Sequence, residues 1–130
     1  MQPLARPRHS GEHMLIVEPS KLSLLRIRAS GWLGAKDYQW FDTEFEYQLQ
    51  LRSPPVPLLL DLRGFRGWTP AGFMSDLMWD LRNRDSFSKI AVVGSARWHS
   101  WMTSLGATLF KAPLKYFGND EEQRAREWLI

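Results

Sequence analysis

Residues 57–69 (PLLLDLRGFRGWT) and 90–102 (IAVVGSARWHSWM) are the two stretches of this chain that decide its fold. Each starts as a short apolar run that ends in Asp or Gly, and each then changes to a helical pattern. Apolar runs of this length, polar only at their ends, indicate strands buried on both faces of a sheet. One helix-length segment separates them, which is typical of a β-α-β unit. The sequence therefore predicts an α/β domain with a mostly parallel sheet.

The flanking sequence extends this pattern to the order β-β-α-β-α-β-α-β-α. The tight turn Pro19-Ser20-Lys21 joins the first two strands and predicts an antiparallel N-terminal hairpin. The first helix is expected to have one apolar face, with side chains spaced by three and four residues: Tyr38, Phe41, Phe45 and Leu49. The expected strands are 14–18, 22–29, 58–62, 90–93 and 114–117, and the expected helices are about 36–52, 70–84, 96–110 and 119–129.

Glycines and prolines mark the expected breaks. Residues 30–34 (SGWLG) predict a break after the second strand, and Gly64 and Gly67 predict a loop after the third. Thr69 and Pro70 fit a helix start, with threonine as N-cap and proline at the first helical position. Residues 1–13 hold two prolines and no periodicity, so we expect a disordered tail before a single domain at 14–130.

The composition is that of a folded domain and excludes several kinds of site. A chain of 130 residues with 44% apolar and 24% charged residues suits one globular domain. The absence of cysteine excludes a disulfide scaffold, a thiol nucleophile and Cys-ligated metals, and it fits the cytoplasm, where we expect the protein. No apolar run is long enough to span a bilayer. The net charge of +3 comes from scattered lysines and arginines, so we expect no nucleic-acid partner.

The order of these segments resembles the SpoIIAA-like family of small bacterial proteins, which is related in fold to the STAS domain. The resemblance spans about residues 14–130 and is carried by Asp61-Leu62 with Gly67-Trp68, AVVG at 91–94 with Trp98, and Tyr116-Phe117 with Trp128-Leu129. It implies a mixed, mostly parallel sheet of about five strands, with an antiparallel N-terminal hairpin and helices chiefly on one face. It implies little about activity, because the family lacks an established biochemical function.

The resemblance also draws attention to Thr69. Anti-sigma-factor antagonists of the STAS type carry a phosphorylatable serine, usually in Asp-Ser-Ser-Gly, after the strand that matches residues 58–62. This chain reads WTPAG at 68–72, so that serine is absent and Thr69 is the hydroxyl at the helix start. Its expected task is capping, although a phosphate there would be well placed at a helix N-terminus. A phospho-regulated partner switch with Thr69 or Ser75 as acceptor stays open.

The carboxyl ends of the strands are the best place for a ligand, because open α/β sheets form their crevice there. The residues expected to gather at that edge are Asp61, Arg63, Gly67, Trp68, Gly94, Ser95 and Trp98. The alternative is that Asp61 pairs locally and the tryptophans complete the core. Seven Trp and seven Phe are many for this length, so exposed aromatics beside the crevice are further candidate contacts.

No catalytic, metal or cofactor site is expected. Asp76, Asp80 and Arg84 follow at four-residue steps on one predicted helix, which is typical of a solvated face with an ion pair. His99 is the lone histidine of the predicted domain and has no second ligand one helical turn away. An enzyme using Asp61, Asp76 and His99 would need these side chains to converge in space.

The leading hypothesis is a small non-enzymatic binding module. It would hold a partner protein or an apolar small molecule, either in the strand-end crevice or at an exposed tryptophan surface, and we expect it to form a homodimer. The alternatives are the phospho-regulated switch, the enzyme and a peripheral membrane contact.

Overall fold

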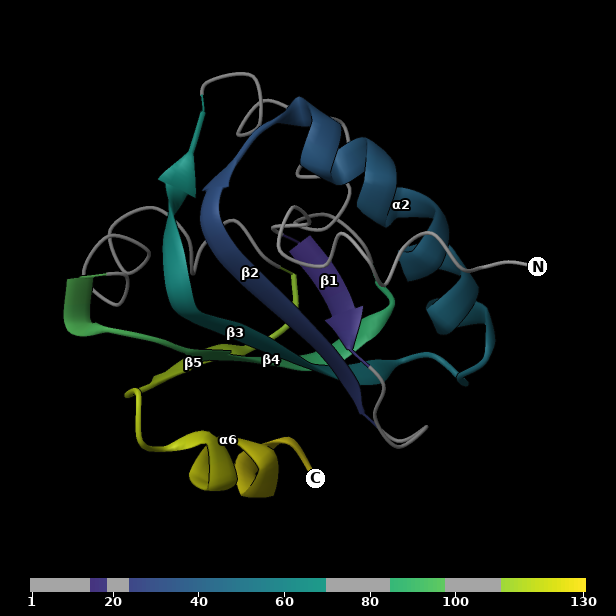
Figure 1. Cartoon of the computed structure of the whole chain (residues 1–130). Helices are drawn as coiled ribbons and strands as arrows, with labels where there is room; N and C mark the ends of the chain where they lie inside the picture. The colour runs from purple at the N-terminus through teal and green to yellow at the C-terminus, as the bar shows by residue number, and fades with distance from the viewer. Residues whose placement is uncertain (1–14, 19–23, 70–84, 98–110) are drawn as a thin grey trace.

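A five-stranded mixed sheet forms the centre of the computed structural model, which describes residues 15–18, 24–69, 85–97 and 111–130 (Figure 1). Its elements are β1 (Leu15–Glu18), β2 (Leu25–Leu33), α2 (Ala35–Gln50), β3 (Val56–Trp68), β4 (Phe87–Val93), β5 (Leu114–Phe117) and α6 (Glu122–Leu129). The strands lie in the order β1-β2-β3-β4-β5. β1 is antiparallel to β2 and every other pair is parallel, which confirms the predicted sheet and its N-terminal hairpin.

The two apolar strands predicted first lie side by side and run in the same direction. Leu59 of β3 is in register with Ala91 of β4, and Leu60 is in register with Val92. Both strands are interior, since β2 and β5 flank them. The stretch between them, expected to be a helix at 70–84, lies outside the described residues. The same holds for the expected tail at 1–13 and for nearly all of the helix expected at 96–110.

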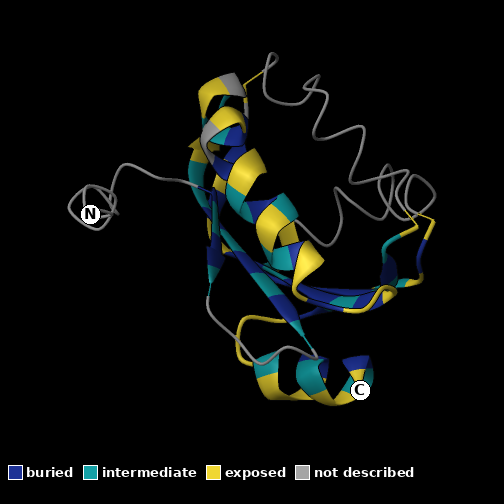
Figure 2. Cartoon of the chain, turned by 90° about the vertical axis from the view of Figure 1, so that its right-hand side faces the viewer, coloured by how far each residue is buried: buried dark blue, intermediate teal, exposed yellow. Residues whose placement is uncertain are grey.

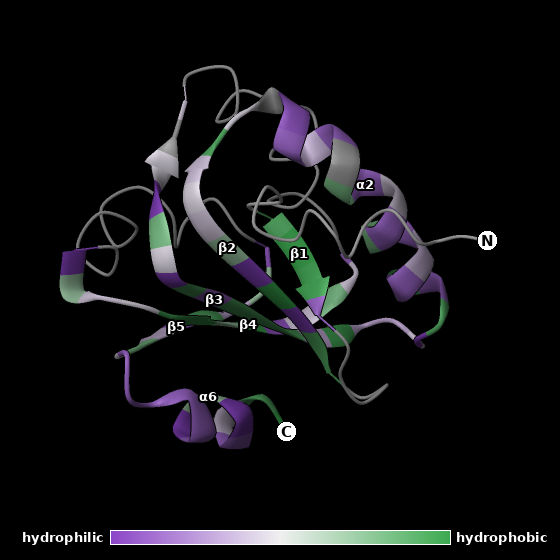
Figure 3. Cartoon of the chain, viewed as in Figure 1, coloured by the Kyte–Doolittle hydropathy of each residue, from purple (hydrophilic) through white to green (hydrophobic). Residues whose placement is uncertain are grey.

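The two faces of the sheet bury separate apolar clusters. Successive side chains of a strand point to opposite faces, so Leu58 joins one cluster and Leu59 the other. The larger cluster contains the apolar face of α2, and the smaller one contains Ala125 and Leu129 of α6. Of the helices in the described residues, α2 and α6 therefore cover opposite faces of the sheet (Figure 2), whereas helices chiefly on one face were expected. Figure 3 shows hydrophobic residues concentrated along the central strands and hydrophilic ones along the outer sides of both helices.

The apolar face of α2 is the one predicted from its spacing. All four expected side chains are buried: Tyr38, Phe41, Phe45 and Leu49. At the start of the helix, the Asp37 carboxylate accepts a hydrogen bond of 2.7 Å from the backbone N–H of Gly34. An acidic group in this position is favourable because it compensates the helix dipole.

The structure corrects two predicted breaks. Residues 30–33 continue β2 and residues 64–68 continue β3, where a break and a loop were expected. The two extensions pair with each other, with Ser30 opposite Gly64 and Trp32 opposite Gly67. We call this pair the β2–β3 arm. Gly31 and Gly67 take positive φ angles of 63° and 149°, so the glycines allow bulges that shift the register without ending the strands.

Candidate functional site

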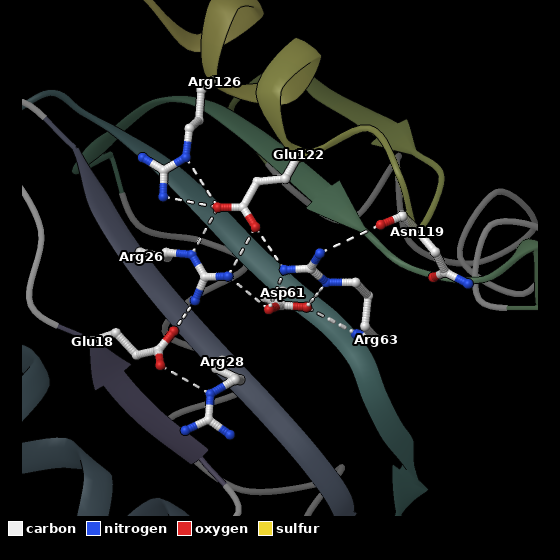
Figure 4. Close-up of polar contacts among 8 residues, drawn as sticks. All are labelled: Glu18, Arg26, Arg28, Asp61, Arg63, Asn119, Glu122 and Arg126. Atoms are coloured by element: carbon white, nitrogen blue, oxygen red, sulfur yellow. Dashed lines mark hydrogen bonds and ion pairs between the residues drawn. The ribbon is translucent and has the colours of Figure 1, made fainter.

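A buried carboxylate lies at the centre of a charged cluster on the sheet face that α6 covers, here called the α6 face (Figure 4). Asp61 of β3 shares this face with Leu59 and is only 4% exposed. One of its oxygens accepts hydrogen bonds from the backbone N–H and Nε of Arg63, at 3.0 and 2.9 Å. The other accepts from Nη2 of Arg63 at 2.9 Å and from Nη2 of Arg26 at 2.7 Å. Four donors thus surround the Asp61 carboxylate.

A second carboxylate, from Glu122, brings α6 into the same cluster. It accepts hydrogen bonds from Nη2 of Arg63 at 2.6 Å and from Nη2 and Nε of Arg26 at 3.0 and 3.1 Å. On the β1 side, Glu18 forms ion pairs with Arg26 and Arg28. We call these groups, with Arg126 of α6, the ionic cluster: Glu18, Arg26, Arg28, Asp61, Arg63, Glu122 and Arg126. It ties three strands to the C-terminal helix.

The electrostatics of the ionic cluster keep both carboxylates charged. Burial raises the pKa of Asp61, but hydrogen bonds and charge from Arg63, aided by Arg26, outweigh it and hold the pKa at about 2. The hydrogen bond from Arg26 lowers the pKa of Glu122 to about 2, against the effect of burial. In return, the hydrogen bond to Asp61 raises the pKa of Arg63. A carboxylate with such a low pKa and four donors is a weak general base, so this arrangement suits fastening better than proton transfer.

The second notable feature of the α6 face is an exposed tryptophan on the β2–β3 arm. Trp32 is 59% exposed, although its ring rests on the backbone of Gly67. A Cβ atom added to Gly67 would lie only 2.8 Å from Cζ3 of Trp32. Next to this contact, Ser30 and Gly64 stand opposite each other and carry little side chain. We define the Trp32 surface as Trp32 together with the arm residues beside it and the arginine that reaches them: Ser30, Gly64, Arg66, Gly67 and Arg97.

The structure brings together only part of the predicted strand-end crevice. Asp61 and Arg63 are in contact, whereas Gly67 is six residues further along β3, about 20 Å if the strand were straight. Gly94 donates its N–H to the Phe117 carbonyl at 3.0 Å and packs against Leu62. Of the other predicted crevice residues, Ser95 follows β4 and is half-buried, while Trp98 and the side chain of Trp68 lie outside the described residues.

Thr69 is exposed and follows directly on β3. Its backbone N–H donates to the Leu33 carbonyl at 2.8 Å, so its main chain is fixed at the tip of the arm. The remaining candidates lie outside the described residues: Ser75, Asp76, Asp80, Arg84 and His99. In the part that is described, no group of three His, Asp or Glu side chains is arranged to hold a metal ion.

Three residues that carry the site were missed in the sequence. Arg26 and Glu122 were not among the expected site residues, and Trp32 lay in the stretch expected to be a break. The sequence did carry a signal for the pairing of Arg26 with Asp61, because an aspartate inside an apolar strand needs a cation on the same face. For Trp32 the signal is weaker. Gly64 and Gly67 normally indicate a loop, but in this chain they allow a bulged pair of strands.

Replacing Gly67 with alanine is expected to cost about 1–3 kcal/mol of stability, because its φ of 149° disfavours other residues and a Cβ would collide with Trp32. Chemical denaturation measures the loss. The emission maximum of tryptophan fluorescence should also shift in Gly67→Ala, because the Trp32 indole is displaced. The same substitution made together with Trp32→Phe should cause no such shift. Gly64→Ala is the matched control, since its Cβ would meet Ser30 at a tolerable 3.4 Å. Equal losses for both variants would contradict the prediction.

Comparison with known proteins supports the fold seen here. A family model described as SpoIIAA-like matches residues 24–130. Among solved structures, the chain is similar to an uncharacterised protein from the DUF3478 family with a SpoIIAA-like fold, from Shewanella loihica PV-4. The TM-score is 0.72 at 23% identity, over 89% of this chain and 92% of the other, so the likeness concerns the fold alone. No curated protein matches the chain. None of the helices within the described residues is long and apolar enough to cross a membrane.

Proposed function

Because this chain belongs to the SpoIIAA-like family, as its motifs predicted, we propose that it is a small non-enzymatic binding module that uses the Trp32 surface. The observation that supports this most is the 59% exposure of a tryptophan held firmly on a strand. Tryptophan is enriched among the side chains that dominate binding energy, and truncating such a residue often costs 2 kcal/mol or more, which is about 30-fold in affinity.

The seating of Trp32 favours binding because its side chain loses little conformational freedom on contact. Its ring already lies against Gly67, and the register shifts of the arm fix where it projects. A side chain ordered before binding loses less conformational entropy when a partner covers it. A small apolar ligand is held best in a concave site, whereas this indole projects from a strand pair. We therefore favour a partner protein over an apolar small molecule.

The ionic cluster supports the non-enzymatic part of the proposal. Asp61 is the one member of the hypothetical catalytic set among the described residues, and arginines occupy both of its oxygens. Its pKa of about 2 leaves it with little affinity for a proton at neutral pH. We assign it to fastening β2, β3 and α6 together.

The test is selection of random peptides on the wild-type protein, with counter-selection on Trp32→Ala. We expect enriched peptides whose affinity falls by about tenfold or more in Trp32→Ala, and no change in Tyr47→Ala, an exposed aromatic on α2. Analytical ultracentrifugation of the same variants shows whether a second copy of the chain is the partner. The proposal is abandoned if no peptide and no self-association depends on Trp32.

A second candidate is the phospho-regulated partner switch. The position of Thr69 favours this switch. Thr69 is exposed, and its backbone N–H binds the carbonyl of Leu33, the residue next to Trp32. A phosphate there would place about −1.5 to −2 charges beside the proposed contact surface. Incubation with a kinase of the anti-sigma type, followed by intact-mass measurement, tests this. An unchanged mass, or equal phosphorylation of Thr69→Ala, removes Thr69 as the acceptor.

A further inference from the structure

The charges around Trp32 identify the chemistry of the partner. We infer that the Trp32 surface binds an acidic segment of another protein, in which carboxylates flank an aromatic or large apolar side chain. This inference rests on the proposed function of the Trp32 surface and specifies its partner.

Arg66 lies on the same face as Trp32. Leu33 and Phe65 are both buried in the apolar cluster beneath α2, on the opposite side of the arm. Because neighbouring side chains of a strand alternate, Trp32 and Arg66 point to the α6 face. The register steps from Gly31 opposite Phe65 to Trp32 opposite Gly67, so Arg66 and Gly67 both stand opposite Trp32 at a bulge, and Arg66 is exposed. Side chains on adjacent strands and one face are about 5–8 Å apart, so one ligand can touch both.

A second guanidinium, from the segment that follows β4, reaches the same place. The pairing of β3 with β4 ends at Asp61 and Val93, so Arg66 lies beyond the part of β3 that pairs with β4. Arg97, four residues after Val93, donates from Nη2 to the Arg66 carbonyl at 3.3 Å. Two exposed arginines thus stand at the tip of the arm beside an exposed indole.

The contrast with the ionic cluster indicates which charge a partner would bring to Arg66. Arg26, Arg28 and Arg63 each form an ion pair with a carboxylate of this chain. Among the described residues, no carboxylate forms an ion pair with Arg66. Guanidinium groups bind carboxylates in a planar, two-pronged geometry, so an acidic partner would supply a counter-charge to Arg66. Complementary charge also speeds association and rejects basic partners.

A protein segment fits this surface better than a membrane. Binding to a lipid surface needs several apolar side chains inserted together. The other exposed large apolar residues of the described chain lie elsewhere, on α2 or just after it and at the C-terminus: Tyr47, Leu51 and Ile130. A short segment with one apolar anchor and a few carboxylates matches what is present.

The experiment uses the peptides selected on the full chain, about nine residues long, enough to extend along the arm. The enriched peptides should carry at least two acidic residues next to an aromatic or large apolar one. Their affinity should fall by about tenfold in Arg66→Glu and should weaken as salt rises from about 50 to 300 mM. Arg124→Glu, an exposed arginine on α6, is the matched control and should leave binding unchanged.

The outcomes separate the partner chemistry from the proposed function. Trp32-dependent peptides without acidic residues, or with equal affinity for Arg66→Glu, would overturn the inference and leave the proposed function standing. If no peptide binding and no self-association depends on Trp32, both are overturned. Vesicles containing about 30% phosphatidylserine test the alternative of membrane binding. Sedimentation with these vesicles that depends on Trp32 and Arg66, without peptide binding, would assign the surface to lipid instead.

Discussion

Replacing Phe45 with alanine is expected to lower the free energy of unfolding by about 3–5 kcal/mol. The Phe45 side chain is fully buried. Its ring stacks on that of Phe41 with centroids 5.1 Å apart, and its centroid lies 6.2 Å from that of the Phe87 ring of β4. Alanine would leave a cavity between α2 and the sheet, because partners fixed on two elements cannot close it. Urea denaturation measures the loss.

Tyr47→Ala provides the control for this prediction on the same helix. Tyr47 is 55% exposed, so its truncation should change stability by at most about 0.5 kcal/mol. Phe45→Leu should fall between the two, since leucine fills part of the space. If Phe45→Ala and Tyr47→Ala lost similar amounts, the helix face would not be packed as described.

That face of α2 shows what the sequence was able to predict. The spacing of Phe41, Phe45 and Leu49 identified both the helix and its buried side, since a local period of 3.6 residues directly reports which side chains meet the core. The strands at β3 and β4 were identified for a similar reason. A run such as LLLDL is buried on both sides, and only interior strands of a parallel sheet provide two covered faces.

The site could not be predicted in the same way, because its contacts join distant parts of the chain. Asp61 is hydrogen-bonded to Arg26, which is 35 residues away, and Glu122 reaches Arg26 across 96 residues. No local pattern fixes such pairs. For the arm, local rules favoured the wrong answer: glycines at 64 and 67 are typical of loops, but pairing with residues 30–33 stabilises them as a bulged strand. The exposed Trp32 follows from that pairing.

The ionic cluster leads to the other large effect, which is expected for Asp61→Asn. We expect a loss of about 2–4 kcal/mol, because the substitution leaves the guanidinium of Arg26 without one of its carboxylates in a largely buried position. The side chain of Arg26 is only 12% exposed, while that of Arg63 is 37% exposed and can turn to water. Because Arg63 can reach water, we expect the loss of stability in Asp61→Asn to be smaller than the largest losses seen when a fully buried ion pair is broken. Asp85→Asn, which removes a carboxylate that is 86% exposed, should change stability by at most about 0.5 kcal/mol.

The pH dependence distinguishes a lost charge from a merely altered shape at Asp61. The folded state lowers the pKa of Asp61 from 3.8 to about 2, which corresponds to roughly 2.5 kcal/mol. A lowered pKa means that the unfolded chain binds the proton more readily, so the stabilisation is complete above about pH 5 and is lost as pH falls toward 2. The gap between wild type and Asp61→Asn should therefore be constant from pH 5 to 7 and should narrow below about pH 4. A gap that stayed unchanged down to pH 2 would mean that packing, and not the charge of the Asp61 carboxylate, holds β2, β3 and α6 together.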